Sequence, residues 1–149
     1  MRAVVQRVTR ASVTIDGEVT GRIGAGYVVL LGVGQHDTRV QADTLWGKLR
    51  GLRINEDDAG KTNLSLADVD GEVLVVSQFT LYANCRRGRR PSFTDAADPA
   101  LANELYEYFV GLVRADVERV ATGTFAANMQ VELVNDGPFT IVLDTDQLA

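Results

Sequence analysis

Alternating and continuous runs of apolar residues predict strands in the first quarter of the chain. Residues 2–15 alternate between apolar and polar positions, and the apolar phase changes at Thr9-Arg10, which predicts one long strand with a bulge. Asp16-Gly17 is typical of a tight hairpin turn, so residues 18–23 are expected to form the return strand. The nearly continuous apolar run over residues 27–33 is typical of a strand that is buried on both faces.

Apolar residues at helical spacing predict two helices. The first is expected to begin at Thr38, because Thr38 and Gln41 have the spacing of a capping box and an apolar stripe follows them. The second is expected to begin with Asp98 as the N-cap and Pro99 at the first helical position.

The remaining segments predict three more strands and two loops. The strands are expected at residues 73–79, 129–134 and 139–143, and the polar segments 55–70 and 84–91 are expected to be loops. The sequence contains no internal repeat, low-complexity segment or linker. The pattern therefore predicts a single β-rich α/β domain over residues 1–149.

The composition of the chain excludes several classes of protein. The chain has 149 residues, of which 46% are apolar, and this is too apolar for a disordered chain. No apolar run approaches the roughly 18 residues of a membrane span, so no membrane partner is expected. The first seven residues meet charge too early for a secretory signal, and the one cysteine, Cys85, fits a reducing compartment. We expect a cytoplasmic protein.

The residues that carry most catalytic and metal chemistry are scarce. The one histidine, His36, falls in a predicted loop between a strand and a helix, and a solvated loop residue is its simplest interpretation. With one histidine and one cysteine, no metal site built from these side chains is expected. Gly60-Lys61-Thr62 resembles the end of a phosphate-binding P-loop, but Asn55 stands where that loop needs glycine. No cofactor is expected.

Charge is unevenly placed along the chain. The formal net charge is −5, yet residues 1–53 carry a net charge of +4 and residues 91–149 a net charge of −8. A dense basic cluster lies between these regions and consists of Arg86, Arg87, Arg89 and Arg90. Arginine favours bidentate contacts with phosphate, so the cluster is either a site for a nucleic-acid backbone or a solvated loop.

Two short segments have unusual composition and resemble motifs of a known family. They are Ser77-Gln78-Phe79-Thr80-Leu81, where an apolar strand ends in polar residues, and Asn135-Asp136-Gly137-Pro138-Phe139-Thr140. With further matches such as Val5-Gln6-Arg7-Val8 and Arg90-Pro91-Ser92-Phe93, the chain resembles the D-aminoacyl-tRNA deacylase family over essentially its whole length. Phe139 departs from the family pattern, in which valine usually follows the Gly-Pro pair.

This resemblance implies a fold, a reaction and partners. The implied fold has mixed sheets curled like a barrel and two main helices. The implied enzyme is a cytoplasmic homodimer with its active site at the subunit interface, and it hydrolyses the ester of D-aminoacyl-tRNA and of glycyl-tRNA during translational proofreading. In the family the Gly-Pro peptide bond is cis and reaches into the partner subunit's pocket. Gly137 and Pro138 would then exclude an L side chain but not glycine.

The resemblance also implies which residues act on the ester. The expected catalytic residues are Ser77, Gln78, Phe79 and Thr80. The Thr80 hydroxyl is either the nucleophile or a positioning group, and the backbone N–H groups of Phe79 and Thr80 are expected to line an oxyanion hole. The 2′-OH of the tRNA can assist the reaction. Ser77 and Gln78 would orient the strand end or the terminal adenosine, and the four arginines would bind the acceptor stem.

Two other functions remain open from the residues alone. One is an esterase or amidase that uses Thr80 as a covalent nucleophile on a small substrate and needs no tRNA. The other is a non-catalytic module that binds tRNA or a protein, in which Gly137-Pro138 is only a turn.

Overall fold

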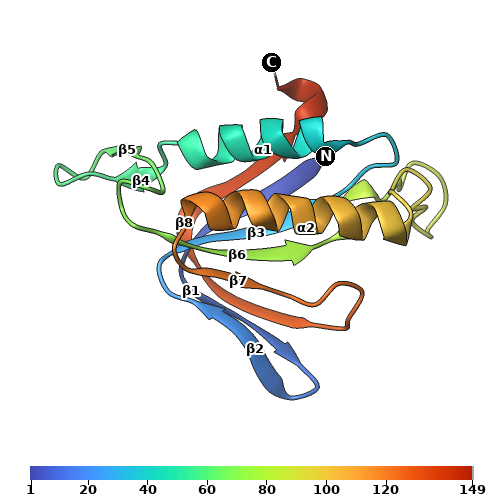
Figure 1. Cartoon of the computed structure of the whole chain (residues 1–149), viewed down its shortest axis with the longest axis horizontal. Coiled ribbons are helices and arrows are strands. Elements are labelled where there is room, and N and C mark those ends of the chain that lie inside the picture. The colour runs from blue at the N-terminus through green and yellow to red at the C-terminus, as the bar shows by residue number, and fades with distance from the viewer. Residues whose placement is uncertain (149) are drawn as a thin grey trace.

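The computed structural model describes residues 1–148 as a curled mixed sheet with two helices packed on one face (Figure 1). The helices are α1 (Arg39–Gly51) and α2 (Pro99–Asp116), with short 3-10 helices η1 (Phe79–Tyr82) and η2 (Thr145–Gln147). The strands are β1 (Arg2–Ile15), β2 (Glu18–Ile23), β3 (Gly26–Gly32), β4 (Asn55–Glu56), β5 (Thr62–Leu64), β6 (Glu72–Ser77), β7 (Val120–Thr122) and β8 (Gln130–Asp144). The predicted α/β class with a barrel-like sheet and two main helices is confirmed.

The long strand β1 organises the sheet. The strand order is β2-β1-β3-β6-β7, and β8 pairs with the other edge of β1 along almost all of its length. β1 is antiparallel to β2, β3 and β8, whereas β3, β6 and β7 run parallel. The predicted bulge is confirmed by a register shift between Val8 and Arg10. The hairpin turn is confirmed as well, because Asp16 and Gly17 both have positive φ.

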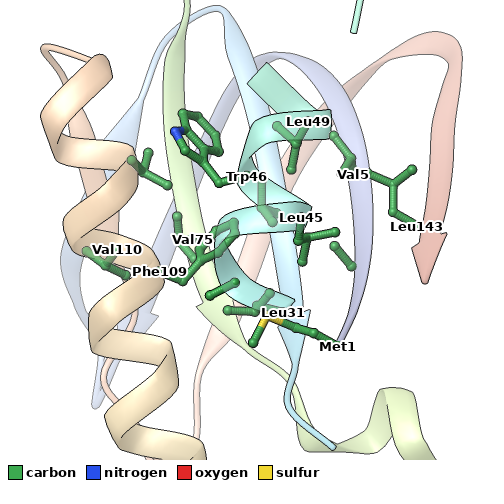
Figure 2. Packing of buried hydrophobic residues seen from close by; sticks show 14 of the residues in the cluster. Met1, Val5, Leu31, Leu45, Trp46, Leu49, Val75, Phe109, Val110 and Leu143 are labelled. Atoms are coloured by element: carbon green, nitrogen blue, oxygen red, sulfur yellow. The ribbon is translucent and has the colours of Figure 1, made fainter. Parts of the chain in front are cut away.

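Apolar side chains fill both faces of the central strands. Under the helices, Leu45 and Leu49 of α1 and Phe109 of α2 pack on Leu31 and Val75 of the sheet (Figure 2). A second cluster inside the curl contains Val8, Val13, Val28, Leu74 and Val76. β3 and β6 are therefore buried on both sides, which is why their sequences are continuous apolar runs.

The predicted helix starts are correct, and three short strands were not predicted. Thr38 caps α1 with the complete capping box, and the Asp98 carboxylate accepts a hydrogen bond from the N–H of Leu101 at the start of α2. The predicted loop over residues 55–70 contains the β4–β5 hairpin, which stays polar because it is largely exposed. β7 was not predicted, since three residues are too few to show a period.

Two further predicted boundaries differ from the structure. The strand predicted over residues 73–79 ends at Ser77, and Phe79 begins η1. The strands predicted over residues 129–134 and 139–143 form the single strand β8, so Gly137-Pro138 is a bulge within a strand and not a turn between two. Within residues 1–148, no helix has the length and apolar character needed to cross a lipid bilayer.

Candidate functional site

A pocket of about 570 Å³ opens where β6 ends, and this volume suits a small ligand. Ser77, Gln78 and Phe79 form one wall. The opposite walls come from the segment before α2, the first turn of α2 and residues 125–131, and they are mostly apolar. Three of the four predicted catalytic residues therefore line one pocket, and Thr80 does not.

Backbone hydrogen bonds explain why the chain turns at this point. The N–H of Gln78 donates to the carbonyl of Leu31 at 2.7 Å, which extends the β3–β6 pairing by one residue. The N–H of Leu81 then donates to the carbonyl of Gln78, and η1 begins. This turn leaves Phe79 55% exposed, and its ring lies edge-on to that of Phe93 with 5.1 Å between ring centroids. Two aromatic rings thus form part of the pocket wall.

Within residues 1–148, no base is hydrogen-bonded to the Thr80 hydroxyl. Thr80 is exposed, and its Oγ1 accepts a hydrogen bond from the side-chain amide of Gln78. Gln78 makes no side-chain capping bond to η1. Among residues 1–148, no hydrogen bond engages the N–H groups of Phe79 or Thr80, so two adjacent backbone donors are free for a ligand.

The Gly137-Pro138 pair projects from the surface as a bulge of β8. Gln6 of β1 pairs with Thr140 and Val8 pairs with Asn135, so four residues of β8 stand opposite a single residue of β1. Gly137 and Pro138 are exposed, and their peptide bond is cis, as the resemblance implied. Neither residue lines the pocket at the end of β6 in its own chain.

Arg7 anchors this bulge from the core. Its side chain is 7% exposed, and Nη1 donates to the carbonyl of Ile54 at 2.6 Å. Its Nε and Nη2 donate to the carbonyls of Asp136 and Gly137 at 3.1 and 3.4 Å. The guanidinium also pairs with the Asp136 carboxylate at 3.2 Å and stacks over Phe139. One buried arginine therefore fixes the backbone on both sides of the Asp136–Gly137 bond.

The four arginines lie in an exposed loop beside the pocket. Asn84 and Ser92 close this loop through paired backbone hydrogen bonds, and Phe93 of the pocket wall follows directly. In the described part of the chain, Arg86, Arg87, Arg89 and Arg90 form no ion pair. The loop lies beyond the N-terminal end of α2 (Figure 1). Its positive charge is thus available to a ligand that enters the pocket.

Other chemistry at this end of the molecule is limited. His36 is exposed in the loop between β3 and α1, as predicted. Over residues 1–148, no group of three or more His, Cys, Asp or Glu side chains is arranged to hold a metal ion. Burial, and secondarily the Asp37 carboxylate, raises the pKa of Tyr82 in η1 above its ordinary value, so this hydroxyl stays protonated at neutral pH.

Sequence reasoning assigned no role to Arg7 or Phe93, although both were part of the resemblance. The alternation of residues along β1 could have identified Arg7 as buried, because it falls on the same strand face as Ala3 and Val5, which are fully buried. A charge at a core position indicates a specific set of partners. Phe93 had no periodic signal, since it lies in a loop.

The sequence has close relatives among known proteins. Residues 4–144 match the family model described as D-Tyr-tRNA(Tyr) deacylase. A protein named D-aminoacyl-tRNA deacylase from Fervidobacterium nodosum is 57% identical over 148 residues, which cover 99% of both chains. Proteins of the same name from Anaeromyxobacter dehalogenans and Koribacter versatilis are each 59% identical, over 99% and 97% of both chains.

Solved structures share the fold. A structure described as c-Myc DNA Unwinding Element Binding Protein has a TM-score of 0.92 and 43% identity, and covers 97% of this chain and 98% of its own. A probable eukaryotic D-amino acid tRNA deacylase has a TM-score of 0.81 over 95% of this chain and 97% of its own. At 18% identity, this second likeness concerns the fold alone.

Proposed function

This chain belongs to the D-Tyr-tRNA(Tyr) deacylase family and is a D-aminoacyl-tRNA deacylase, a hydrolase of the ester bond to tRNA, and we propose that it selects D substrates with a filter supplied by a second copy of itself. One observation carries this proposal. The pocket residues Ser77, Gln78 and Phe79 and the projecting pair Gly137-Pro138 are separate in one chain. A homodimer in which the bulge of each protomer enters the partner's pocket unites them.

The exposed strand β8 supports a contact between copies. Val142 is 71% exposed and Val134 is 37% exposed, so the strand that carries the bulge also presents apolar side chains. The Gly137 and Pro138 carbonyls would accept hydrogen bonds from the α-ammonium of the substrate. With ammonium and ester both fixed, an L side chain meets the Gly-Pro backbone and a D side chain points to solvent. Glycine has no side chain to reject and is therefore also a substrate.

The reaction itself needs no side-chain nucleophile. Water attacks the ester carbonyl carbon, and the N–H groups of Phe79 and Thr80 donate to the oxyanion that develops there. Such donors each contribute about 2.7–4 kcal/mol to the transition state. The bond to the 3′-oxygen then breaks, and the proton that the attacking water loses passes to this oxygen through the adjacent 2′-OH. Ser77 and Gln78 orient the terminal adenosine in the pocket, and Thr80 supports Gln78.

The same proposal covers the domain organisation, the cellular compartment and the cofactor requirement of the enzyme. Residues 1–149 act as a single deacylase domain in the cytoplasm, where charged tRNA is present. No cofactor takes part in the proposed reaction, because backbone donors, water and the tRNA hydroxyl supply every group that it needs. The overall charge of −5 restricts tRNA binding to local basic patches.

A matched set of substrates tests this function. We expect rapid deacylation of D-tyrosyl-tRNA and glycyl-tRNA and almost none of L-tyrosyl-tRNA, measured as release of the labelled amino acid. The methyl ester of D-tyrosine is the control without tRNA, and it should remain intact. Equal rates for D- and L-tyrosyl-tRNA would contradict the filter. Rapid cleavage of the methyl ester, with a burst, would instead support a small-molecule esterase that uses Thr80.

The basic loop gives a second testable prediction. Replacing Arg86, Arg87, Arg89 and Arg90 with glutamine is expected to weaken tRNA binding and to flatten its dependence on salt. Each lost phosphate contact reduces the slope of log K against log salt by about 0.7–0.9. The measurement is tRNA affinity over a salt series, with Arg39→Gln and Arg50→Gln on α1 as a charge control. A quadruple variant with wild-type affinity and slope would identify a solvated loop.

A further inference from the structure

The turn η1 packs against two glycines at and just after the end of β3, Gly32 and Gly34, which have no side chains. A Cβ atom built on Gly32 would lie 2.9 Å from Cβ of Leu81 and 3.1 Å from the carbonyl oxygen of Gln78. A Cβ atom on Gly34 would lie 2.9 Å from the ring of Tyr82. Because real Cβ atoms essentially never come within 3.0 Å of another heavy atom, a larger residue at either position would displace the turn. The position of η1 therefore depends on direct packing against backbone.

Arg2 holds the turn next to Gly32. In the sheet register, Arg2 of β1 lies between Gly32 of β3 and Asp144 of β8. Its Nη1 donates to the carbonyl of Leu81 at 3.1 Å, and its guanidinium carbon lies 4.4 Å from the centroid of the Tyr82 ring. Its Nε donates to the Asp144 carboxylate at 3.0 Å. The carboxylate fixes the arginine, and the arginine fixes two residues of the turn.

We propose that Arg2, oriented by Asp144, is a positioning residue for deacylation. The inference rests on the proposed function, in which the N–H groups of Phe79 and Thr80 stabilise the oxyanion. These donors and the Leu81 carbonyl belong to the same four-residue turn. A shift of Leu81 and Tyr82 therefore moves the donors relative to the pocket. Arg2 itself does not line the pocket, so it acts through the turn and not on the substrate.

Only an arginine satisfies all three contacts at once. The planar guanidinium directs separate N–H groups to the Asp144 carboxylate and the Leu81 carbonyl while its face covers Tyr82. A lysine ammonium is a single point charge and reaches one acceptor at a time. The structure therefore predicts a graded series in which Arg2→Lys retains part of the activity and Arg2→Met retains least.

The experiment separates positioning from binding and from folding. Single-turnover cleavage of D-tyrosyl-tRNA is measured at saturating enzyme for wild type, Arg2→Lys, Arg2→Met and Asp144→Asn, together with tRNA affinity and Tm. We expect Arg2→Met to lower the rate constant roughly tenfold to a hundredfold, since small misplacements of catalytic groups have effects of this size. Arg2→Lys and Asp144→Asn should fall between it and wild type. Affinity should stay within about twofold of wild type.

A matched control and distinct outcomes keep the inference falsifiable. Arg39 on α1 also stacks on a tyrosine, with its guanidinium carbon 4.8 Å from the centroid of the Tyr108 ring on α2, so Arg39→Met removes the same kind of contact between the two helices and keeps the contacts of Arg2 with η1. Its rate constant should match wild type. A wild-type rate in folded Arg2→Met would overturn the inference. If Arg2→Met does not fold, a wild-type rate in both Arg2→Lys and Asp144→Asn overturns it instead. Inactive wild-type enzyme would contradict the proposed function, not this inference alone.

Discussion

Replacing Arg7 with methionine is expected to impair D-aminoacyl-tRNA cleavage while the chain still folds. Methionine fills most of the space but leaves the carbonyls of Ile54, Asp136 and Gly137 without their donor. A hydrogen bond from a charged donor contributes about 1.5–3 kcal/mol, and of these three bonds only the one to Ile54 is fully buried, so we expect the free energy of unfolding to fall by about 3 kcal/mol. The released bulge no longer presents Gly137 and Pro138 in one position. Single-turnover deacylation should therefore fall roughly a hundredfold.

Asp136→Asn is the control that isolates the backbone contacts of Arg7. It removes the ion pair with Arg7 but keeps the Asp136 carbonyl that Arg7 also binds. The Asp136 side chain is half exposed, so this pair contributes only about 0–1 kcal/mol. Its deacylation rate should stay within about threefold of wild type. Arg7→Met with normal activity per folded protein would show that the bulge needs no anchor and that Arg7 serves stability alone.

The pattern of apolar residues predicted the elements whose boundaries depend on residues that are adjacent in the sequence. The bounds of β1 and β2 were predicted without error, because a phase change and an Asp-Gly turn are local signals. The start of α1 followed from the Thr38 capping box in the same way. By contrast, β7 forms because it pairs with β6, which is distant in sequence. A pattern of three residues cannot predict such a pairing.

The candidate site was predictable only in part, because its pieces meet through tertiary contacts. The segment Ser77 to Thr80 had a visible signal, since an apolar strand ended in hydroxyl and amide side chains. The turn at Phe79 had none, because it depends on packing against the bare backbone at Gly32. Likewise, Gly137-Pro138 was predicted as a turn between strands, although Arg7 and Asn135 hold it as a bulge inside one strand.

Removing the 2′-OH of the terminal ribose is expected to impair cleavage far more than removing the Thr80 hydroxyl. Positioned proton transfer contributes about 10²–10⁴-fold, so a 2′-deoxy D-tyrosyl-tRNA should lose a factor in this range. Thr80→Val keeps β-branching and loses one neutral hydrogen bond, the one that Thr80 Oγ1 accepts from Gln78. Such a bond is worth about 0.5–1.5 kcal/mol, which corresponds to roughly a threefold to tenfold loss. Single-turnover rates at saturating enzyme measure both effects.

The contrast follows from what surrounds the two hydroxyls. A threonine nucleophile needs a base that accepts its proton, yet the group hydrogen-bonded to Thr80 Oγ1 is an amide donor. The one histidine, His36, is exposed in the β3–α1 loop, and within residues 1–148 it forms no hydrogen bond with Thr80. The 2′-OH, in contrast, is attached next to the leaving oxygen and needs no protein group to place it. An inactive Thr80→Val enzyme with normal fold and tRNA affinity, combined with efficient cleavage of the deoxy substrate by wild type, would reverse this assignment and identify Thr80 as the nucleophile.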